Sequence, residues 1–225
     1  MHEMVLNAIT QLADLGGPVV MLLVGISIIA LAVMTYKLWQ FAASGVGRHR
    51  ALQSAIEAWD RGERLDAKDQ LLRSRSYLND IVALGMGGKV DAGRLEAEAE
   101  ERFARLERGF RLLDSIAQLA PLLGLFGTVL GMISAFQALQ SAGDQVDPAI
   151  LAGGIWVALL TTAVGLAVAM PTALVLSWFE ARIDADRVFA GKAIRTLLAP
   201  AHQGADTAIL AEPPATEDLR RPSVA

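Results

Sequence analysis

Two long apolar stretches in the second half of this 225-residue chain contain hydroxyl groups but no ionisable side chain. No Asp, Glu, Lys, Arg or His lies between Ser115 and Ala142 or between Pro148 and Phe179. The hydroxyl side chains there include Thr128, Ser134, Thr161, Thr162, Thr172 and Ser177. Hydroxyl oxygens can relay protons or ligate Na⁺, whereas a pump normally carries an acid, a base or a histidine inside the membrane. These hydroxyls are therefore the candidates for an ion path.

Small residues accompany the hydroxyls at helical spacing. One helix face of the first stretch contains Pro121, Gly124, Thr128, Gly131 and Ala135, with Gly127 and Gly131 forming a GxxxG step. The matching face of the second stretch contains Ala158, Thr162, Gly165, Ala169 and Ala173. We expect the two faces to pack together and to place Thr128 and Thr162 in a common lining. The alternative is that the small residues only permit packing and the threonines bond to carbonyls of their own helices.

Composition points to a membrane protein with a sizeable soluble part, because 53% of the residues are hydrophobic, 20% are charged and the mean hydropathy is +0.41. There is no cysteine, and the three histidines lie far apart in the sequence. We therefore expect no metal site and no cofactor. A phosphate-binding GxxxxGK[ST] loop and a Ser/His/Asp catalytic set are also missing from the pattern. The chain is predicted not to be an enzyme and not to bind nucleic acid.

The apolar spans divide the chain into membrane and soluble segments. The predicted fold is an all-α membrane protein with three transmembrane helices, of which helices 2 and 3 extend into a cytoplasmic helical bundle. An uninterrupted helix is expected to run from the stripe of apolar residues between Leu95 and Leu113 into the second span. The expected segments are an interfacial helix at 1–16, transmembrane helices at 17–42, 115–140 and 151–179, a cytoplasmic helical loop at 43–114, a periplasmic loop at 141–150, a helix extension at 180–200 and a disordered tail at 201–225.

The distribution of basic residues predicts the topology. Every Lys and Arg lies between residues 37 and 111 or after residue 181, and none lies in the N-terminal segment or in the loop at 141–150. Basic residues concentrate on the cytoplasmic side of membrane proteins. We therefore expect a periplasmic N-terminus and a cytoplasmic C-terminus. Because positive charge does not precede the first span, that span is expected to be a retained anchor and not a cleaved signal peptide.

Two motifs in these spans resemble a known family. The segments LAPLLGLFGTVLGMISAF at 119–136 and GGIWVALLTTAVGLAVAMP at 153–171 are similar to the ExbB/TolQ/MotA proton-channel family. A single span before the large loop resembles the ExbB and TolQ branches more than the flagellar branch. The resemblance implies that Thr128, and Thr162 with Thr161 beside it, line the central pore.

The resemblance also implies an assembly in the bacterial inner (plasma) membrane. The expected complex is a homopentamer around a dimer of ExbD/TolR-like single-span partners that carry an Asp. Such a complex uses the proton motive force and passes work to a TonB- or TolA-like protein. The leading expectation is an ExbB-like subunit that energises TonB-dependent transport across the outer membrane. The alternatives are a TolQ-like subunit for envelope integrity and cell division, a non-conducting scaffold for a single-span partner, and a sodium-driven variant.

One position departs from the family pattern. ExbB- and TolQ-like sequences commonly carry a glutamate in the third span, five positions before the second threonine, and that position is Val157 here. This departure implies that the partner's own span supplies the titrating carboxylate.

Overall fold

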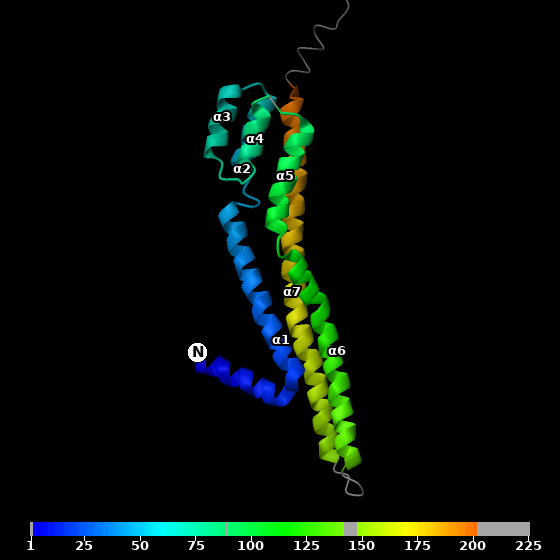
Figure 1. The fold of residues 1–225 in the computed structure, drawn as a ribbon. Helices are drawn as coiled ribbons and strands as arrows, with labels where there is room; N and C mark the ends of the chain where they lie inside the picture. Colours follow the sequence, from blue (N-terminus) through cyan, green and yellow to red (C-terminus); the bar gives the residue numbers. More distant parts are fainter. Residues whose placement is uncertain (1, 89, 142–147, 202–225) are drawn as a thin grey trace, which may run out of the picture. The chain divides into compact units, whose positions relative to one another are not determined.

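All the regular elements of the protein are α-helices. The computed structural model describes residues 2–88, 90–141 and 148–201, and no strand occurs among them. The helices are α1 (His2–Ser44), α2 (Arg50–Asp60), α3 (Arg64–Arg73), α4 (Asn79–Met86), α5 (Ala92–Glu107), α6 (Phe110–Ser141) and α7 (Pro148–Leu198), as labelled in Figure 1. The all-α prediction is confirmed. Most of the expected periplasmic loop and of the expected disordered tail lies outside the described residues.

The chain divides into two compact units. The first comprises residues 1–46 and 102–185, and the second comprises residues 47–101 and 186–225. Three helical segments are long and apolar enough to cross a membrane, namely Gly17–Ser44, Phe110–Ser141 and Leu151–Leu198. This confirms the prediction of three membrane-spanning helices. Because a bilayer core requires only about 20 helical residues, α7 with its 51 residues continues well beyond a single crossing.

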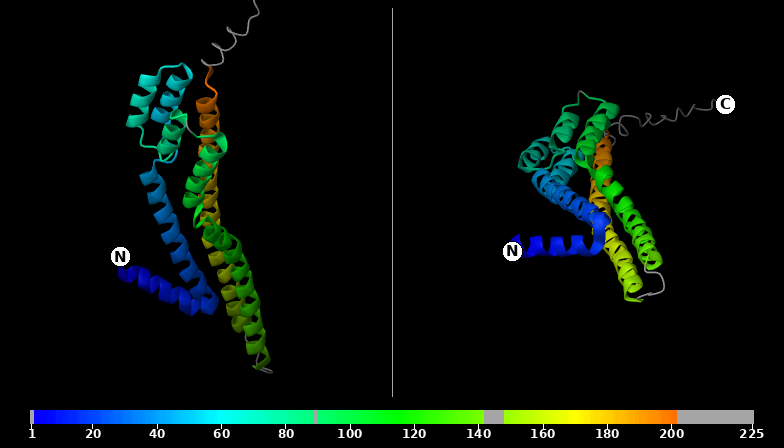
Figure 2. Two further views of the ribbon diagram at one scale, coloured as in Figure 1. Left: turned by 45° about the horizontal axis from the view of Figure 1, so that its top comes forward. Right: turned by 60° about the horizontal axis from the view of Figure 1, so that its bottom comes forward.

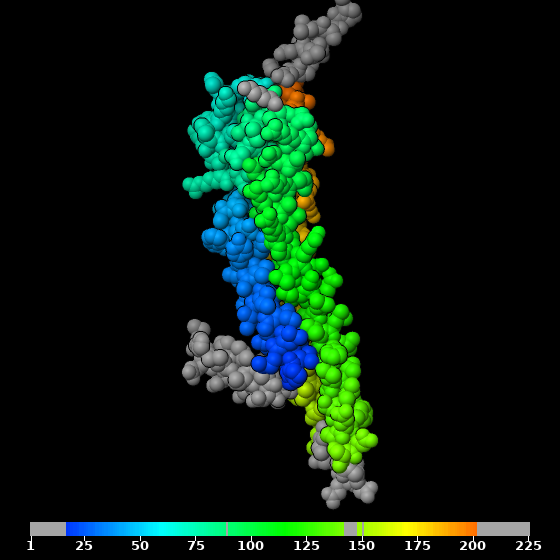
Figure 3. All heavy atoms as spheres, in the orientation of Figure 1, coloured from blue at the N-terminus to red at the C-terminus, as the bar shows by residue number. Residues whose placement is uncertain are grey.

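The first unit packs its helices around small and medium apolar side chains. In every view α6 runs beside the first part of α7 (Figures 1 and 2). The buried cluster consists of Val19, Leu23, Ala30, Ile116, Ala120, Val168 and Ala169. Large apolar side chains of α6 such as Leu122, Leu125 and Phe126 are instead exposed, on a helix whose outer surface is green in Figure 3. Large residues outside and small residues inside are typical of helices packed within a lipid bilayer.

Helix α1 is interrupted near its N-terminal end. Gly17 has φ of 66° and ψ of −166°, which is not a helical conformation, and Pro18 follows it. A positive φ is favourable for glycine because it lacks a Cβ atom. The bend separates residues 2–16 from the membrane-spanning part of α1, as the sharp turn in Figure 2 shows.

The helix expected to run without interruption into the second span is broken at Arg108 and Gly109. Helix α5 ends at Glu107, α6 begins at Phe110, and Gly109 between them has φ of 94°. A lone glycine inside a periodic pattern is tolerated in many helices, so the sequence pattern did not reveal the break. The apolar stripe from Leu95 to Leu113 is buried within this chain, including Phe103 at 1% exposure.

The second unit is a small helical bundle. Helix α2 packs with α3 and α4, and Gly85 of α4 lies against Leu95 of α5 and Leu197 of α7. Its buried side chains include Leu52, Leu78, Ile81, Leu95, Ile194 and Leu197. The indole Nε1 of Trp59 in α2 donates a hydrogen bond to the carbonyl of Leu197 at 3.2 Å, and Arg64 stacks over the Trp59 ring at 3.6 Å. This contact holds the C-terminal end of α7 against α2.

Candidate functional site

Glycine residues of α6 bring its backbone against α7. A Cβ atom added to Gly124 would lie 2.9 Å from the Thr161 carbonyl oxygen, and one added to Gly131 would lie 3.1 Å from the Ala158 Cβ. On α7, a Cβ added to Gly165 would lie 2.6 Å from the Ala120 carbonyl oxygen. Real Cβ atoms essentially never approach other atoms within 3.0 Å, so a larger residue at Gly124 or Gly165 would force the facing backbone to shift, and one at Gly131 would be tightly packed. The two small faces therefore contact each other directly.

Two threonine hydroxyls of α7 converge on one carbonyl of α6. The Thr161 hydroxyl donates to the Ala158 carbonyl of its own helix at 2.7 Å and also lies 3.1 Å from the Gly124 carbonyl oxygen. The Thr162 hydroxyl donates to the same Gly124 carbonyl at 3.3 Å. Thr161 is only 1% exposed. A cross-helix cluster of three oxygen atoms thus lies within the membrane-spanning part of the protein.

Thr128 occupies a different environment. Its hydroxyl donates to the Leu125 carbonyl within α6 at 2.7 Å, so within one chain Thr128 and Thr162 bond to different carbonyls. The side chain that fills the centre of the α6–α7 contact is Thr161, since a Cβ on Gly127 would lie 2.6 Å from its Oγ1. The sequence pattern places Thr161 only beside Thr162. The recurrence of small residues at Gly154, Ala158, Thr161 and Gly165 is the sequence signal for this second face.

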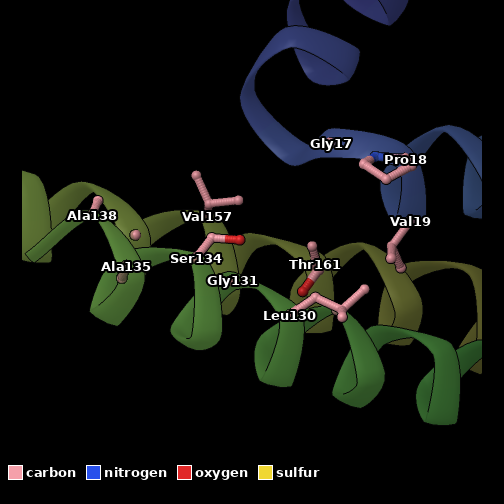
Figure 4. Close-up of a pocket in the computed structure, with 12 residues that line it drawn as sticks. Gly17, Pro18, Val19, Leu130, Gly131, Ser134, Ala135, Ala138, Val157 and Thr161 are labelled. Atoms are coloured by element: carbon pink, nitrogen blue, oxygen red, sulfur yellow. The ribbon is translucent and has the colours of Figure 1, made fainter. Parts of the chain in front are cut away.

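A cavity of about 460 Å³ opens between α6, α7 and the bend of α1. Its lining includes Val157 and Thr161 of α7, Ser134 of α6 and Gly17 of α1. Figure 4 shows the Ser134 and Val157 side chains near one another, with Thr161 further along α7 and its hydroxyl turned toward α6. Val157 therefore faces a cavity and lines it with a hydrocarbon side chain.

The remaining residues of the predicted packing face lie where α6 and α7 meet. Ala158 is 3% exposed and Ala169 is 5% exposed, and Ala135 contacts Gly154, where a Cβ atom would clash with the Ala135 Cβ. Pro121 is inside α6 and half-buried. Within the described residues, no group of three or more His, Asp or Glu side chains gathers as a set of metal ligands.

The family model and the related proteins that match this chain all point to the same family. Residues 78–188 match the MotA/TolQ/ExbB proton channel family. A biopolymer transport protein ExbB homologue from Methanothermobacter thermautotrophicus is 34% identical over 63% of this chain and 51% of its own length. An ExbB-like biopolymer transport protein from Synechocystis is 31% identical over 71% of this chain and 66% of its own length. The Tol-Pal system protein TolQ of Pseudomonas aeruginosa is 36% identical over 44% of this chain and 42% of its own length.

The matched regions thus span between about half and two thirds of the length of the two ExbB-type relatives. The family match includes α4, α5, α6 and α7 as far as residue 188. It therefore contains the threonine and glycine residues of the α6–α7 contact.

Proposed function

Because the chain belongs to the MotA/TolQ/ExbB proton channel family, we propose that it is an inner-membrane subunit of an ExbB-like motor. This motor uses the proton motive force to energise TonB-dependent transport across the outer membrane. The convergence of the Thr161 and Thr162 hydroxyls on the Gly124 carbonyl is the observation that carries the proposal. It supplies exchangeable hydroxyl protons inside a membrane span in which the chain has no ionisable side chain.

The proposed mechanism divides the work between two chains. Threonine hydroxyls on this subunit donate and accept hydrogen bonds, and so they can pass a proton along a partly hydrated path. They cannot hold the proton as a charge. Because Val157 replaces the acid commonly found in the third span, the titrating carboxylate belongs to an Asp on the single-span partner. Thr128 and Thr162 face that partner, and Thr161 shares the Gly124 carbonyl with Thr162.

The proposed assembly is a homopentamer around an ExbD/TolR-like dimer, with a TonB- or TolA-like protein as the recipient of the work. The N-terminus lies in the periplasm and the C-terminus in the cytoplasm. The location of all basic residues in the segments at 37–111 and after 181 supports this orientation.

Proton flux in liposomes tests the proposal. The chain is reconstituted with and without an ExbD/TolR-like single-span partner, and uptake is measured under a proton gradient and separately under a sodium gradient. We expect proton flux only when the partner is present. Sodium flux alone would identify the sodium-driven alternative, and a lack of flux with either ion would favour the non-conducting scaffold.

Threonine variants test which hydroxyl groups belong to the proposed ion path. Thr162→Val and Thr128→Val each remove a hydroxyl with little change in shape, and we expect a loss of flux while the ring stays assembled. Thr172→Val is the matched control, because the Thr172 hydroxyl donates only within α7, to the Val168 carbonyl at 2.7 Å. Wild-type flux in the double variant of Thr128 and Thr162 would remove these hydroxyls from the mechanism.

The similarity to the Pseudomonas aeruginosa TolQ protein makes a TolQ-like role the second candidate. Deletion of the gene separates the two roles. Loss of receptor-dependent uptake with an intact envelope supports the ExbB-like role, whereas leakage of periplasmic proteins and chained cells support the TolQ-like role.

A further inference from the structure

Three segments of the second unit meet at a buried carboxylate that plays no part in the proposed ion path. Asp186 on α7 is 2% exposed. Its Oδ2 accepts a hydrogen bond from the Tyr77 hydroxyl at 2.9 Å and one from the Gly47 backbone amide at 3.3 Å. Its Oδ1 lies 2.8 Å from His49 Nε2. The carboxylate thus joins the segment that precedes α2 and the segment between α3 and α4 to α7.

His49 is covered on one face by an aromatic ring and has a polar group near each ring nitrogen. The imidazole stacks on Phe189 of α7 with ring centroids 4.8 Å apart and an interplanar angle of 10°. Its Nδ1 lies 2.9 Å from the Ser76 hydroxyl oxygen, which also accepts a hydrogen bond from the Leu78 amide at 3.2 Å. The side chain is 10% exposed. One nitrogen therefore faces a hydroxyl and the other faces a carboxylate.

The charge balance of this cluster depends on the histidine. Burial, and then the nearby Asp186, raise the pKa of Tyr77, so Tyr77 stays neutral and acts only as a hydrogen-bond donor. Arg187 follows Asp186 on α7 and pairs with Glu100 at 3.0 Å, and Arg48 and Arg50 flank His49 in sequence. Among the three groups that contact Asp186 directly, only His49 can become positively charged. A buried carboxylate is costly without such a partner.

We propose that His49, Asp186 and Ser76 form a proton-responsive clamp. This clamp holds the segment before α2 and the segment between α3 and α4 against α7. When His49 is protonated, Nδ1 donates to Ser76 and the charged ring lies 2.8 Å from Asp186 Oδ1, so the buried carboxylate has its counter-charge. When His49 is neutral, only one nitrogen carries a proton and the ion pair is lost. Histidine is the side chain whose charge ordinarily changes between about pH 5 and pH 8. The clamp therefore tightens on acidification and loosens as the pH rises.

A consequence follows that rests on the proposed function and orientation. If protons pass through the membrane unit into the compartment that contains the second unit, the clamp tightens as that compartment acidifies. The helix that carries Asp186 is the same α7 that carries Thr161 and Thr162. The carboxylate partner of His49 therefore lies on the same helix as the proposed pore residues.

Amide hydrogen exchange on the purified full-length chain tests the clamp without measuring ion flux. Protection of the backbone amides in residues 47–53 and 74–82 is followed from about pH 5 to pH 8, after correction for the intrinsic pH dependence of exchange. In the wild type we expect protection to fall by about tenfold or more across this range, because a hydrogen bond to a charged group is lost.

His49→Gln keeps a neutral side chain able to form hydrogen bonds and should remove the pH dependence, and Asp186→Asn should do the same. His202→Gln is the matched control, because it removes a histidine outside the described residues, and it should retain the wild-type profile. A wild-type profile that does not change with pH, or one that His49→Gln leaves unaltered, would overturn the proposal. A chain that conducts no ions can still pass this test, so its outcome is separate from that of the proposed function.

Discussion

Lys37 donates a hydrogen bond from Nζ to the main-chain carbonyl of Leu106, 69 residues later in the chain, at 2.8 Å. Lys37 lies in the membrane-spanning part of α1 and is 2% exposed. Its ammonium group also donates to the Gln40 side chain at 2.7 Å and lies 5.7 Å from the centre of the Phe110 ring. The last carbonyls of a helix lack amide donors within that helix. Lys37 therefore satisfies a carbonyl at the end of α5, where the helix breaks before α6.

Replacing Lys37 by Met should destabilise the first unit. The change keeps a long flexible side chain but leaves the Leu106 carbonyl without its donor, and a buried unsatisfied polar group costs about 1–3 kcal/mol. Thermal unfolding in detergent measures this loss of stability as a lower unfolding temperature. Leu38→Met is the matched control because Leu38 is exposed at 49%. Equal unfolding temperatures for the two variants would show that the Lys37 contact adds no stability.

The closeness of α6 and α7 predicts different outcomes for two glycines of the same helix. In Gly165→Ala the new Cβ would lie 2.6 Å from the Ala120 carbonyl oxygen. Backbone cannot move aside as a side chain can, so we expect a loss of about 1–3 kcal/mol in the free energy of unfolding. In Gly153→Ala the Cβ meets nothing within 4 Å, and stability should not fall. Comparable destabilisation by both variants would argue against the α6–α7 contact described above.

The cavity next to Val157 should accept a carboxyl side chain at that position. Val157→Glu places a carboxyl group in a space of about 460 Å³ beside Ser134, and we expect the protein to remain folded and assembled. Ala158→Glu makes the same chemical change one residue away, where Ala158 is 3% exposed and contacts Gly131. That variant should aggregate or fail to assemble. Size-exclusion profiles in detergent compare the two, and a folded Ala158→Glu protein would contradict the packing.

Tyr77 should make the second unit sensitive to alkali. Because the pKa of Tyr77 is raised in the folded protein by burial and by Asp186, the neutral hydroxyl stabilises the fold below the ordinary tyrosine pKa of about 10. That stabilisation is lost as the pH rises above this value. Tyr77→Phe lacks the group, so its stability should fall less steeply above about pH 10 than that of the wild type. Parallel pH profiles for the two proteins would refute this role of Tyr77.

At neutral pH the same Tyr77→Phe change should still reduce stability. It removes one of the donors to a carboxylate that is 2% exposed, with an expected cost of about 1–3 kcal/mol in the free energy of unfolding. Chemical denaturation of the full-length chain at pH 7 measures this cost.

The sequence by itself determined the class of protein and its membrane-spanning segments. Uncharged apolar runs of sufficient length must form helices in lipid, because an isolated strand would leave its backbone polar groups unsatisfied there. Helical spacing likewise marked Gly124, Gly131, Ala158 and Gly165 as members of small faces, since residues three and four apart share one side of a helix. The absence of ionisable residues from the second and third spans was also evident from the sequence.

Only the tertiary structure decided which atoms meet. Spacing could not tell whether Thr161 or Thr162 fills the contact with α6, because that depends on the rotation of one helix against another. It also could not reveal the break at Gly109, whose cost is offset by a contact with Lys37 far away in the sequence. The cluster of His49, Ser76, Tyr77 and Asp186 was likewise hidden, since its members come from three separate segments. Periodicity describes one helix at a time, whereas these sites exist only where several helices are brought together.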